Sequence, residues 1–267
     1  FTFNDFTTVL SMHREAASEI MGQLRKIYDG DFSKEFGTGE TVAWKGKIGM
    51  ISGVTTVIHV KKQLYAAMGE RFLMYAMTQP ERIRVAKRAM DSINSVRSRR
   101  ILVREAFAQF LNNEVVMPEE LPNIDEDFQK DLITLANMTT IARSAVDREW
   151  ASPQKEITFV HDPEMPMRFA GQLVTMAKAF MILNDGMLTD MHKRALYKMA
   201  LDSIDKNRLI CLRQLAEYQK VETAGLATKL NYPTTIVRRW LEDLNALGVI
   251  LREKGTSKAD TWEIKPE

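Results

Sequence analysis

The stretch ETAGLATKLNYPTTIVRRWLEDLNALGVILR, residues 222–252, decides how the end of this chain folds. Its apolar residues recur at helical spacing, which predicts one helix over 222–230 and a second over 234–247. The run Asn231-Tyr232-Pro233 separates the two helices, because proline is accepted in a helix only in the first turn. Gly248 ends the second helix. The stretch is therefore a helix, a tight turn and a helix.

The segments on either side complete a recognisable order of elements. A helix is expected over 209–218, before the quoted stretch, and two short strands over 249–252 and 261–264. The strands would pair around a tip at 254–258. Three helices followed by a two-stranded hairpin are typical of a winged helix-turn-helix module, which we place at 204–267.

The second helix of this module is the candidate DNA-reading element. Such a helix presents polar and basic side chains to a groove and keeps its other face apolar. The predicted DNA-binding residues lie in its first turns and at the strand tip: Thr234, Thr235, Arg238, Arg239, Lys254 and Lys258. The predicted core face of the helix is Ile236, Trp240, Leu244 and Leu247. Glu242 and Asp243 on the same helix oppose DNA binding, so a protein-docking module is the alternative.

The composition is that of an ordinary globular protein. The chain has 267 residues, of which 45% are hydrophobic, and a formal net charge of +2, so any surface for nucleic acid must be local. Cys211 is the single cysteine and excludes an intramolecular disulfide, which favours a cytoplasmic location. No apolar run approaches the roughly 20 residues of a membrane span, so no membrane partner is expected.

The fold class predicted for the whole chain is mainly α with a partial α/β core. Three domains are expected: an α/β part at 1–79, a helical domain at 80–203 and the winged helix at 204–267. The α/β part should hold a helix and two buried strands, at 8–28, 47–52 and 71–77. The predicted helices of the second domain are 81–94, 97–113, 126–149, 167–183 and 188–203, with a short strand at 157–160.

Three polar residues in the first two domains are candidates for catalysis. Thr55 follows the first buried strand, Arg71 opens the second, and Arg168 begins a helix. A charge at the start of a buried strand is costly unless it has a task or a partner. The alternatives are an ordinary turn residue for Thr55, an ion pair with Glu70 or another neighbouring acid for Arg71, and a solvated helix end for Arg168.

A glycine-containing hairpin is expected at about 33–47, just before the first buried strand. Lys45 and Lys47 at its end are candidate contacts to a phosphate backbone, with Lys34 as a further one. The alternative is a surface hairpin with ordinary lysines.

Other catalytic arrangements are not supported by the sequence. The phosphate-binding pattern G-x-x-x-x-G-K-[ST] does not occur, and no strand carries the acidic pair that would hold Mg²⁺, with only Asp5 and Glu15 nearby. The four histidines share no ligand spacing with Cys211 or with paired acids. No metal site is therefore expected.

Taken in order, these residues resemble the back half of AAA+ motors of the minichromosome-maintenance and superfamily-3 helicase group, and most closely ATPases of phages and integrated elements. The resemblance rests on short stretches: LSMHRE (10–15), LRKIYDG (24–30), WKGKIG (44–49), ISGVTT (51–56), GERF (69–72), ARSAV (142–146) and the helix that begins at Arg168. In place of the asparagine common in the helicase group stands Thr55, and His59 replaces an expected acid.

The resemblance implies roles and partners. Thr55 would be the first sensor, Arg71 the arginine finger acting on a neighbouring subunit, and Arg168 the second sensor. It implies a DNA-associated ATPase or helicase-like motor that forms a homo-oligomeric ring, with this chain as its C-terminal portion. ATP and Mg²⁺ would serve the parent protein, and this chain alone would bind neither. The alternatives are a non-enzymatic winged-helix DNA-binding regulator and a docking adaptor.

Overall fold

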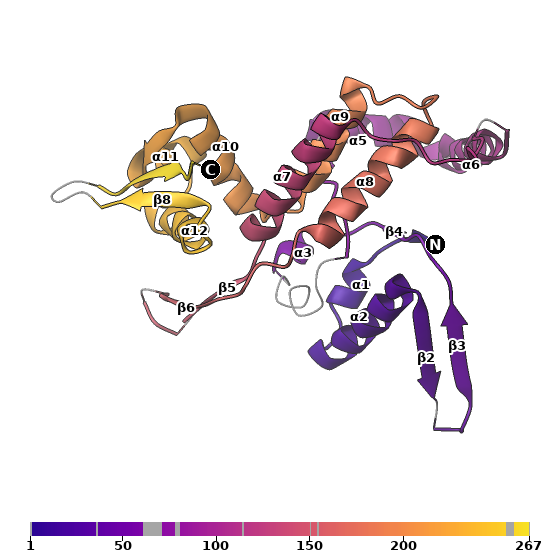
Figure 1. The fold of residues 1–267 in the computed structure, drawn as a ribbon, viewed down its shortest axis with the longest axis horizontal. Helices are drawn as coiled ribbons and strands as arrows, with labels where there is room; N and C mark the ends of the chain where they lie inside the picture. The colour runs from indigo at the N-terminus through magenta and orange to yellow at the C-terminus, as the bar shows by residue number, and fades with distance from the viewer. Residues whose placement is uncertain are drawn as a thin grey trace. The chain divides into compact units, whose positions relative to one another are not determined.

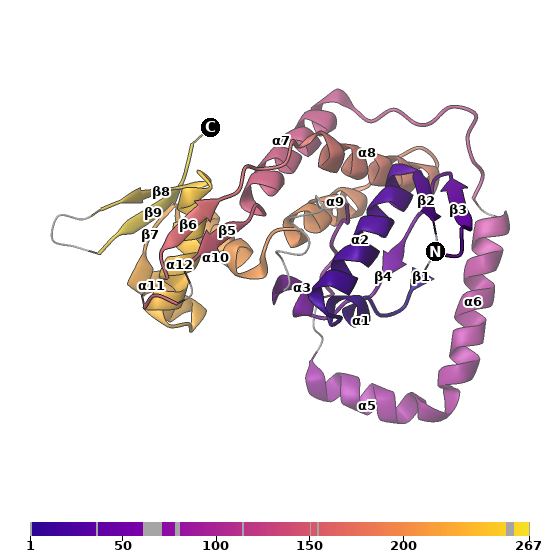
Figure 2. The ribbon, with the colours of Figure 1, turned by 90° about the horizontal axis from the view of Figure 1, so that it is seen from below.

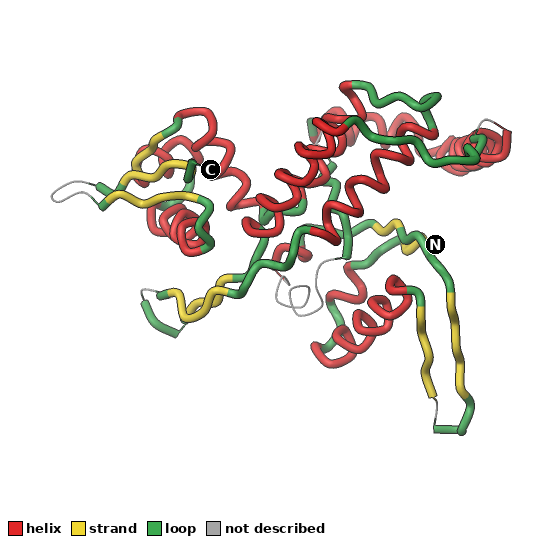
Figure 3. Tube along the Cα trace, viewed as in Figure 1, coloured by secondary structure: helices red, strands yellow, loops and turns green. Residues whose placement is uncertain are grey.

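The protein is mainly helical, and its described residues form four small sheets, as the computed structural model shows (Figures 1 and 3). This confirms the predicted mainly α class with a minor strand content. None of the described helices is long and apolar enough to cross a membrane. The structure describes residues 2–35, 37–60, 71–77, 81–113, 115–149, 151–153, 155–254 and 259–266.

The chain divides into two compact units. The first contains Phe1–Phe72, Met138–Met165 and Ile204–Glu267, and the second contains Leu73–Asn137 and Pro166–Ser203. The predicted domains were contiguous, whereas this division is not, because residues 138–165 group with the C-terminal segment. The three-domain organisation stays a prediction.

The N-terminal segment of the first unit is a small α/β arrangement. Strand β1 pairs in parallel with β4, with Thr2 opposite Ile51 and Phe3 opposite Ser52 (Figure 2). The predicted helix over 8–28 is interrupted at Ser11, so two helices form instead of one. The elements are β1 (Thr2–Phe3), α1 (Thr7–Leu10), α2 (Arg14–Asp29), β4 (Ile51–Ser52) and α3 (Val57–Val60).

This segment has a small apolar core. Phe6, Val9, Leu10 and Met21 are buried in it. The residues that pack against this core from the later part of the segment are Met50, Val54, Val57, Ile58 and Phe72. The core therefore fixes the chain on both sides of Thr55 and next to Arg71.

The predicted hairpin is confirmed as β2 (Asp31–Glu35) and β3 (Thr41–Lys45), which pair antiparallel. Helix α2 ends at Gly30, whose φ of 97° suits glycine. The carbonyl of Gly30 accepts a hydrogen bond from the Gly46 amide, and a Cβ on Gly30 would lie 2.8 Å from the Gly46 carbonyl oxygen. Glycine is thus required where the hairpin joins the helix.

The two predicted buried strands did not form as expected. The strand over 47–52 is reduced to Ile51 and Ser52, and Ile51 is 76% exposed. The prediction of a strand over 71–77 is wrong, since this stretch has no regular structure. Its amides at Met74 and Ala76 donate to the side chains of Ser203 and Asp202 rather than to a neighbouring strand. An apolar run makes a strand only where another strand offers a ladder.

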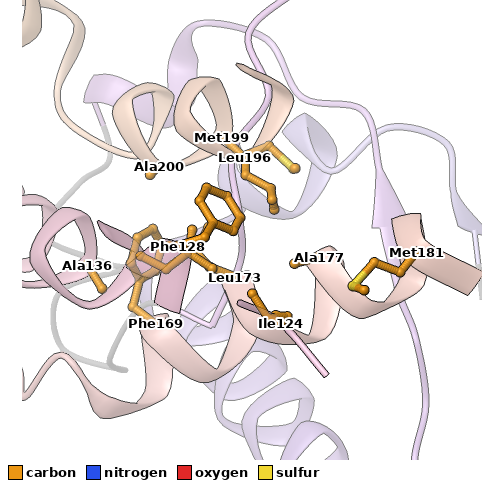
Figure 4. Close-up of a cluster of buried hydrophobic side chains, with 11 residues drawn as sticks. Ile124, Phe128, Ala136, Phe169, Leu173, Ala177, Met181, Leu196, Met199 and Ala200 are labelled. Atoms are coloured by element: carbon orange, nitrogen blue, oxygen red, sulfur yellow. The ribbon is translucent and has the colours of Figure 1, made fainter. Parts of the chain in front are cut away.

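The second unit is built on three packed helices. Its core joins residues that follow helical spacing on α7, α8 and α9 (Figure 4). The core residues are Ile124, Phe128, Leu132, Ala136, Phe169, Leu173, Ala177, Met181, Leu196, Met199 and Ala200. The helices of this part of the chain are α5 (Arg82–Ser92), the 3-10 turn η1 (Ile93–Ser95), α6 (Val96–Asn113), α7 (Glu126–Ala142), α8 (Met167–Ile182) and α9 (Asp190–Asp202).

The predicted helix over 126–149 is too long. Helix α7 ends at Ala142, and β5 (Val146–Arg148) then pairs antiparallel with β6 (Ile157–Val160). The strand predicted over 157–160 is confirmed. The helix ends here because the Arg208 guanidinium donates hydrogen bonds to the carbonyls of Ala142 and Ser144, at 3.1 and 2.6 Å. The residues that follow pair with β6 instead of continuing the helix.

The C-terminal segment follows the predicted order of elements. One strand was not predicted, β7, which forms the edge of a three-stranded antiparallel sheet in the order β7-β9-β8. The elements are α10 (Lys206–Tyr218), β7 (Lys220–Glu222), α11 (Thr223–Leu230), α12 (Thr234–Ala246), β8 (Ile250–Glu253) and β9 (Thr261–Ile264). We call residues 204–266 the C-terminal module.

The buried face of α12 differs from the predicted one. Val237, Leu241 and Leu244 are fully buried, at spacings of four and three residues. Ile236 and Trp240 are only half-buried, and Trp240 packs edge-on against Tyr232. The prediction is confirmed for Leu244 and Leu247, which are buried, and off by one position in the first half of the helix, where Val237 and Leu241 are buried instead. Both sets of residues are apolar, and the contacts with α10 and the sheet select between them.

Candidate functional site

The first half of α12 is an exposed polar surface. Thr234, Thr235 and Arg238 are exposed and Arg239 is half-buried. No side chain caps the start of this helix. The amide groups of the first turn and these side chains therefore face solvent together, which is how a DNA-reading helix offers donors to phosphates and base edges.

The acidic residues of α12 lie in a buried ion-pair network. Asp243 accepts from Arg148 at 2.7 Å and from Arg208 at 3.4 Å, and Glu242 lies 3.4 Å from Arg148. The two arginine side chains are only 5% and 7% exposed. Buried charges need such partners, because the desolvation of an unpaired ion costs several kcal/mol.

This network separates the charges along α12. The carboxylates at its C-terminal half are neutralised by arginines from β5 and α10, while Arg238 at its N-terminal half remains exposed. Arg148 also donates to the Arg239 carbonyl at 3.0 Å, so the β5–β6 hairpin holds this helix directly. The two acids that opposed DNA binding in the sequence are thus bound internally.

Sequence reasoning missed Arg148 and Arg208. Arg148 stands in the predicted helix over 126–149 and Arg208 directly before the one over 209–218, where an arginine is normally solvated. The available signal was the spacing of Arg208, which falls one residue before Leu209 and four before Leu212, on the buried side of α10. The signal for Arg148 was weaker, because its strand was predicted as helix.

The strand tip of the module is described only in part. Lys254 is exposed at the end of β8, and Lys258 lies outside the described residues. Below the tip, Arg252 lies over the Trp262 ring and pairs with Asp260 at 2.5 Å. The hydrogen bond from Arg252 lowers the pKa of the Asp260 carboxyl.

A second polar cluster lies at one edge of the β1–β4 pair. Because the two strands are parallel, their carboxyl ends meet at the same edge, with Asp5 after β1 and Thr55 after β4. Thr7 links them: its amide donates to Asp5 at 2.9 Å, its hydroxyl donates to the Thr55 hydroxyl at 3.3 Å and accepts from the Thr55 amide at 3.1 Å. Asp5 has no predicted role in the sequence, and only the pairing of β1 with β4 reveals its position.

Arg71 is held by an acid. Its guanidinium makes a two-pronged pair with Asp29, at 3.1 to 3.2 Å, and lies over the Tyr28 ring. The side chain of Arg71 is 8% exposed. The alternative from the sequence was a pair with Glu70, which lies outside the described residues, or with another neighbouring acid, whereas Asp29 is 42 residues away in the chain.

The remaining candidate residues are Arg168, Lys45 and Lys47. Arg168 is an exposed residue in the first turn of α8, in the second unit, whereas Thr55 and Arg71 belong to the first. Lys45 is exposed and 3.7 Å from Asp31 across the hairpin, and Lys47 is exposed beyond β3. A common site for the three catalytic candidates therefore stays a prediction.

Neither metal chemistry nor thiol chemistry is indicated in the part of the chain that is described. No cluster of three or more histidine, cysteine, aspartate or glutamate side chains suited to a metal ion occurs there. Burial raises the pKa of the Cys211 thiol to about 12, so this thiol is protonated at neutral pH and is not a nucleophile.

Comparisons with protein-family models, curated proteins and solved structures gave no match to this chain.

Proposed function

We propose that the C-terminal module binds duplex DNA as a winged helix-turn-helix. Its order of elements, α10, β7, α11, α12, β8 and β9, is that of this class of module. Helix α12 would enter the major groove with its first turns, and Lys254 beyond β8 would contact a neighbouring phosphate.

The separation of charge along α12 carries this proposal. A groove-reading helix must approach phosphates, and Glu242 and Asp243 would repel them if their charges were exposed and unpaired. Arg148 and Arg208 neutralise these two acids inside the protein. The face that remains for DNA combines hydroxyls at Thr234 and Thr235 with the Arg238 guanidinium.

The test is DNA binding by the whole chain on double- and single-stranded oligonucleotides across a salt series. We expect duplex binding that weakens steeply with salt, because each neutralised phosphate releases counterions. Arg238→Ala should weaken binding by about 1–3 kcal/mol, or roughly 5- to 150-fold. The matched control is Arg213→Ala, an exposed arginine on α10, which makes the same charge change.

Two outcomes would contradict the proposal. Equal loss of binding in both variants would mean that only overall charge matters. No salt-dependent binding to either oligonucleotide would favour the docking adaptor.

A second proposed function is a contribution to ATP hydrolysis in an AAA+ ring, which the β1–β4 edge favours. In such motors a carboxylate and a polar residue follow two neighbouring parallel strands, as Asp5 and Thr55 do here. Asp5 would contribute to holding Mg²⁺, which stabilises phosphate charge when bound, and Thr55 would orient a water molecule. The 267 residues contain no phosphate-binding loop, so these side chains alone do not fit a nucleotide.

Arg71 would act across a subunit boundary in this scheme. Arg71 must then leave its ion pair with Asp29. The Asp29 side chain is already 51% exposed, so water can solvate its carboxylate once the arginine has left. Arg168 on α8 would touch the same nucleotide from the helical domain.

The test needs a polypeptide that supplies a G-x-x-x-x-G-K-[ST] segment before these residues. Its ATPase rate should fall at least tenfold in Asp5→Asn, and by a factor of about 10³ or more in Arg71→Ala. Unchanged ATPase rates in these variants would exclude the motor function and favour the non-enzymatic DNA-binding regulator.

A further inference from the structure

The two helices α5 and α6 have no packed face. We call residues 82–113 the arm (Figure 2). No residue of α5 is buried, and every residue from Val96 to Asn112 is exposed. Ile83, Met90 and Ile93 are 78%, 75% and 72% exposed. Isolated helices of this length are marginal in water, so packing on a partner would stabilise the arm.

Most exposed apolar residues of the arm form a stripe on each helix, and Val85, Ile101 and Leu102 lie outside these stripes. On α5 the stripe residues follow the spacing of a helix that packs against something, and on α6 they continue along one side. The stripe of α5 with its continuation into η1 is Ile83, Ala86, Met90 and Ile93, and that of α6 is Val96, Val103, Phe107, Phe110 and Leu111. Each such side chain gains about 1.5–3 kcal/mol on full burial, so the stripes mark an interaction surface.

The arm is also strongly basic. It holds eight lysines and arginines against two acids, Asp91 and Glu105, which gives a local charge of +6. On α6, Arg100 lies within the apolar stripe, four residues after Val96 and three before Val103, and Arg104 lies at the edge of the stripe. Within the described parts of the chain these cations form no ion pair. A partner for the arm must therefore be both apolar and acidic.

The segment that follows the arm has this complementary chemistry. Residues 115–127, which we call the acidic segment, contain five acids and no lysine or arginine. Val116, Met117 and Leu121 are 76%, 66% and 54% exposed. The segment has no helix or strand before α7, and its two prolines keep it extended.

We propose that the arm of one copy of this chain binds the acidic segment of a second copy. The arm would bury Val116, Met117 and Leu121 of the second copy against its stripes, while its arginines pair with Glu119 and Glu120. Both surfaces are exposed within one copy, so association would bury their apolar residues and pair their opposite charges at the same time. Two copies can exchange these contacts reciprocally in a two-fold dimer, or each copy can bind the next head-to-tail in a ring or a filament.

This self-association does not depend on DNA binding or on nucleotide. The arm and the acidic segment lie in the second unit, and the DNA surface lies in the first. Failure of one proposal therefore leaves the other intact.

The test is sedimentation of the whole chain over a range of concentrations at low and high salt. We expect concentration-dependent oligomers that dissociate as salt rises, since ion pairs at an exposed interface are screened. Arg100→Glu with Arg104→Glu in the arm should weaken association at least tenfold, and so should Glu119→Lys with Glu120→Lys in the acidic segment.

Mixing these two charge-reversed proteins is the decisive experiment. Each alone should be monomeric, and the mixture should associate again, because the reversed arm of one matches the reversed segment of the other. A misfolded variant would not show this recovery. The matched control is Glu35→Lys with Glu40→Lys on the β2–β3 hairpin, which makes the same charge change and should associate like the unaltered chain.

Two results would overturn the proposal. One is an unaltered chain that stays monomeric at every concentration, and the other is a mixture that fails to associate. If the arm variant instead loses duplex DNA binding with its oligomeric state unchanged, the arm is a nucleic-acid surface and the proposal is wrong.

Discussion

The C-terminal module and the arm use arginine in opposite ways. In the module, Arg148 and Arg208 are 5% and 7% exposed and share the carboxylate of Asp243. In the arm, all seven arginines and the single lysine face solvent, beside apolar side chains that are also exposed. The first set holds a fold together, and the second set is available to a partner.

This difference shows how charge can be divided between structure and function. A buried ion must be paired, so its partner and position are fixed by the fold. An exposed ion contributes little to stability, so a concentration of exposed ions of one sign is better explained by binding. The same reasoning distinguishes Arg238, which is exposed and is proposed to bind DNA, from Arg148, which supports α12.

The largest expected effect follows from breaking the buried network. Arg148→Ala should lower the free energy of unfolding by about 3–5 kcal/mol, because it leaves Glu242 and part of the Asp243 charge buried without their partner. Arg100→Ala in the arm should change it by less than about 0.5 kcal/mol. Urea denaturation followed by circular dichroism measures both, and equal effects would contradict the distinction between the two regions.

A matched pair of leucines tests the apolar side of the comparison. Leu241→Ala removes a fully buried side chain from α12 and should cost about 2–5 kcal/mol. Leu102→Ala acts on a side chain that is 64% exposed on α6 and outside the proposed stripe, and should be nearly neutral. The thermal midpoints should be measured at low protein concentration, where association is absent. A similar loss in both variants would mean that the arm is packed.

The smallest expected effect concerns pH. The hydrogen bond from Arg252 lowers the pKa of Asp260 in the folded module, so the folded state favours the carboxylate. The stabilisation is therefore present above the ordinary pKa of 3.8 and is lost as pH falls through the lowered value. Asp260→Asn should reduce the acid-induced drop in urea midpoint between pH 5 and pH 3.

Arg252→Gln supplies the matched test of this pair, since it removes the partner and should reduce the same drop. An unchanged pH dependence in both variants would show that the pair contributes nothing to the stability of the module.

The fold of the C-terminal module could largely be predicted, because its signals are local. Pro233 and Gly248 mark the start and end of α12, and the helix-turn-helix spacing follows from residues close in the chain. The three-residue strand β7 was missed, since its pairing with β9 joins segments about 40 residues apart. The buried face of α12 was predicted correctly at Leu244 and Leu247 and was off by one position in its first half, because Ile236 and Val237 are equally apolar.

The errors elsewhere have one cause. The stretch 71–77 and the end of the predicted helix over 126–149 both have apolar patterns that suit their predicted states. Their backbone groups found other partners, at Ser203 and Asp202 in the first case and at β6 in the second. Partners so distant in sequence leave no periodic signal.

The sequence by itself determined the helical class, the order of elements in the C-terminal module and the positions of Thr234, Thr235 and Arg238 on its last helix. Only the tertiary structure decided that Arg148 and Arg208 neutralise the acids of that helix, and that Asp5 and Thr55 meet at one strand edge. Helix periodicity and capping are set by neighbours within a few residues. Ion pairs and strand pairing join residues tens of positions apart, and they exist only once the chain has folded.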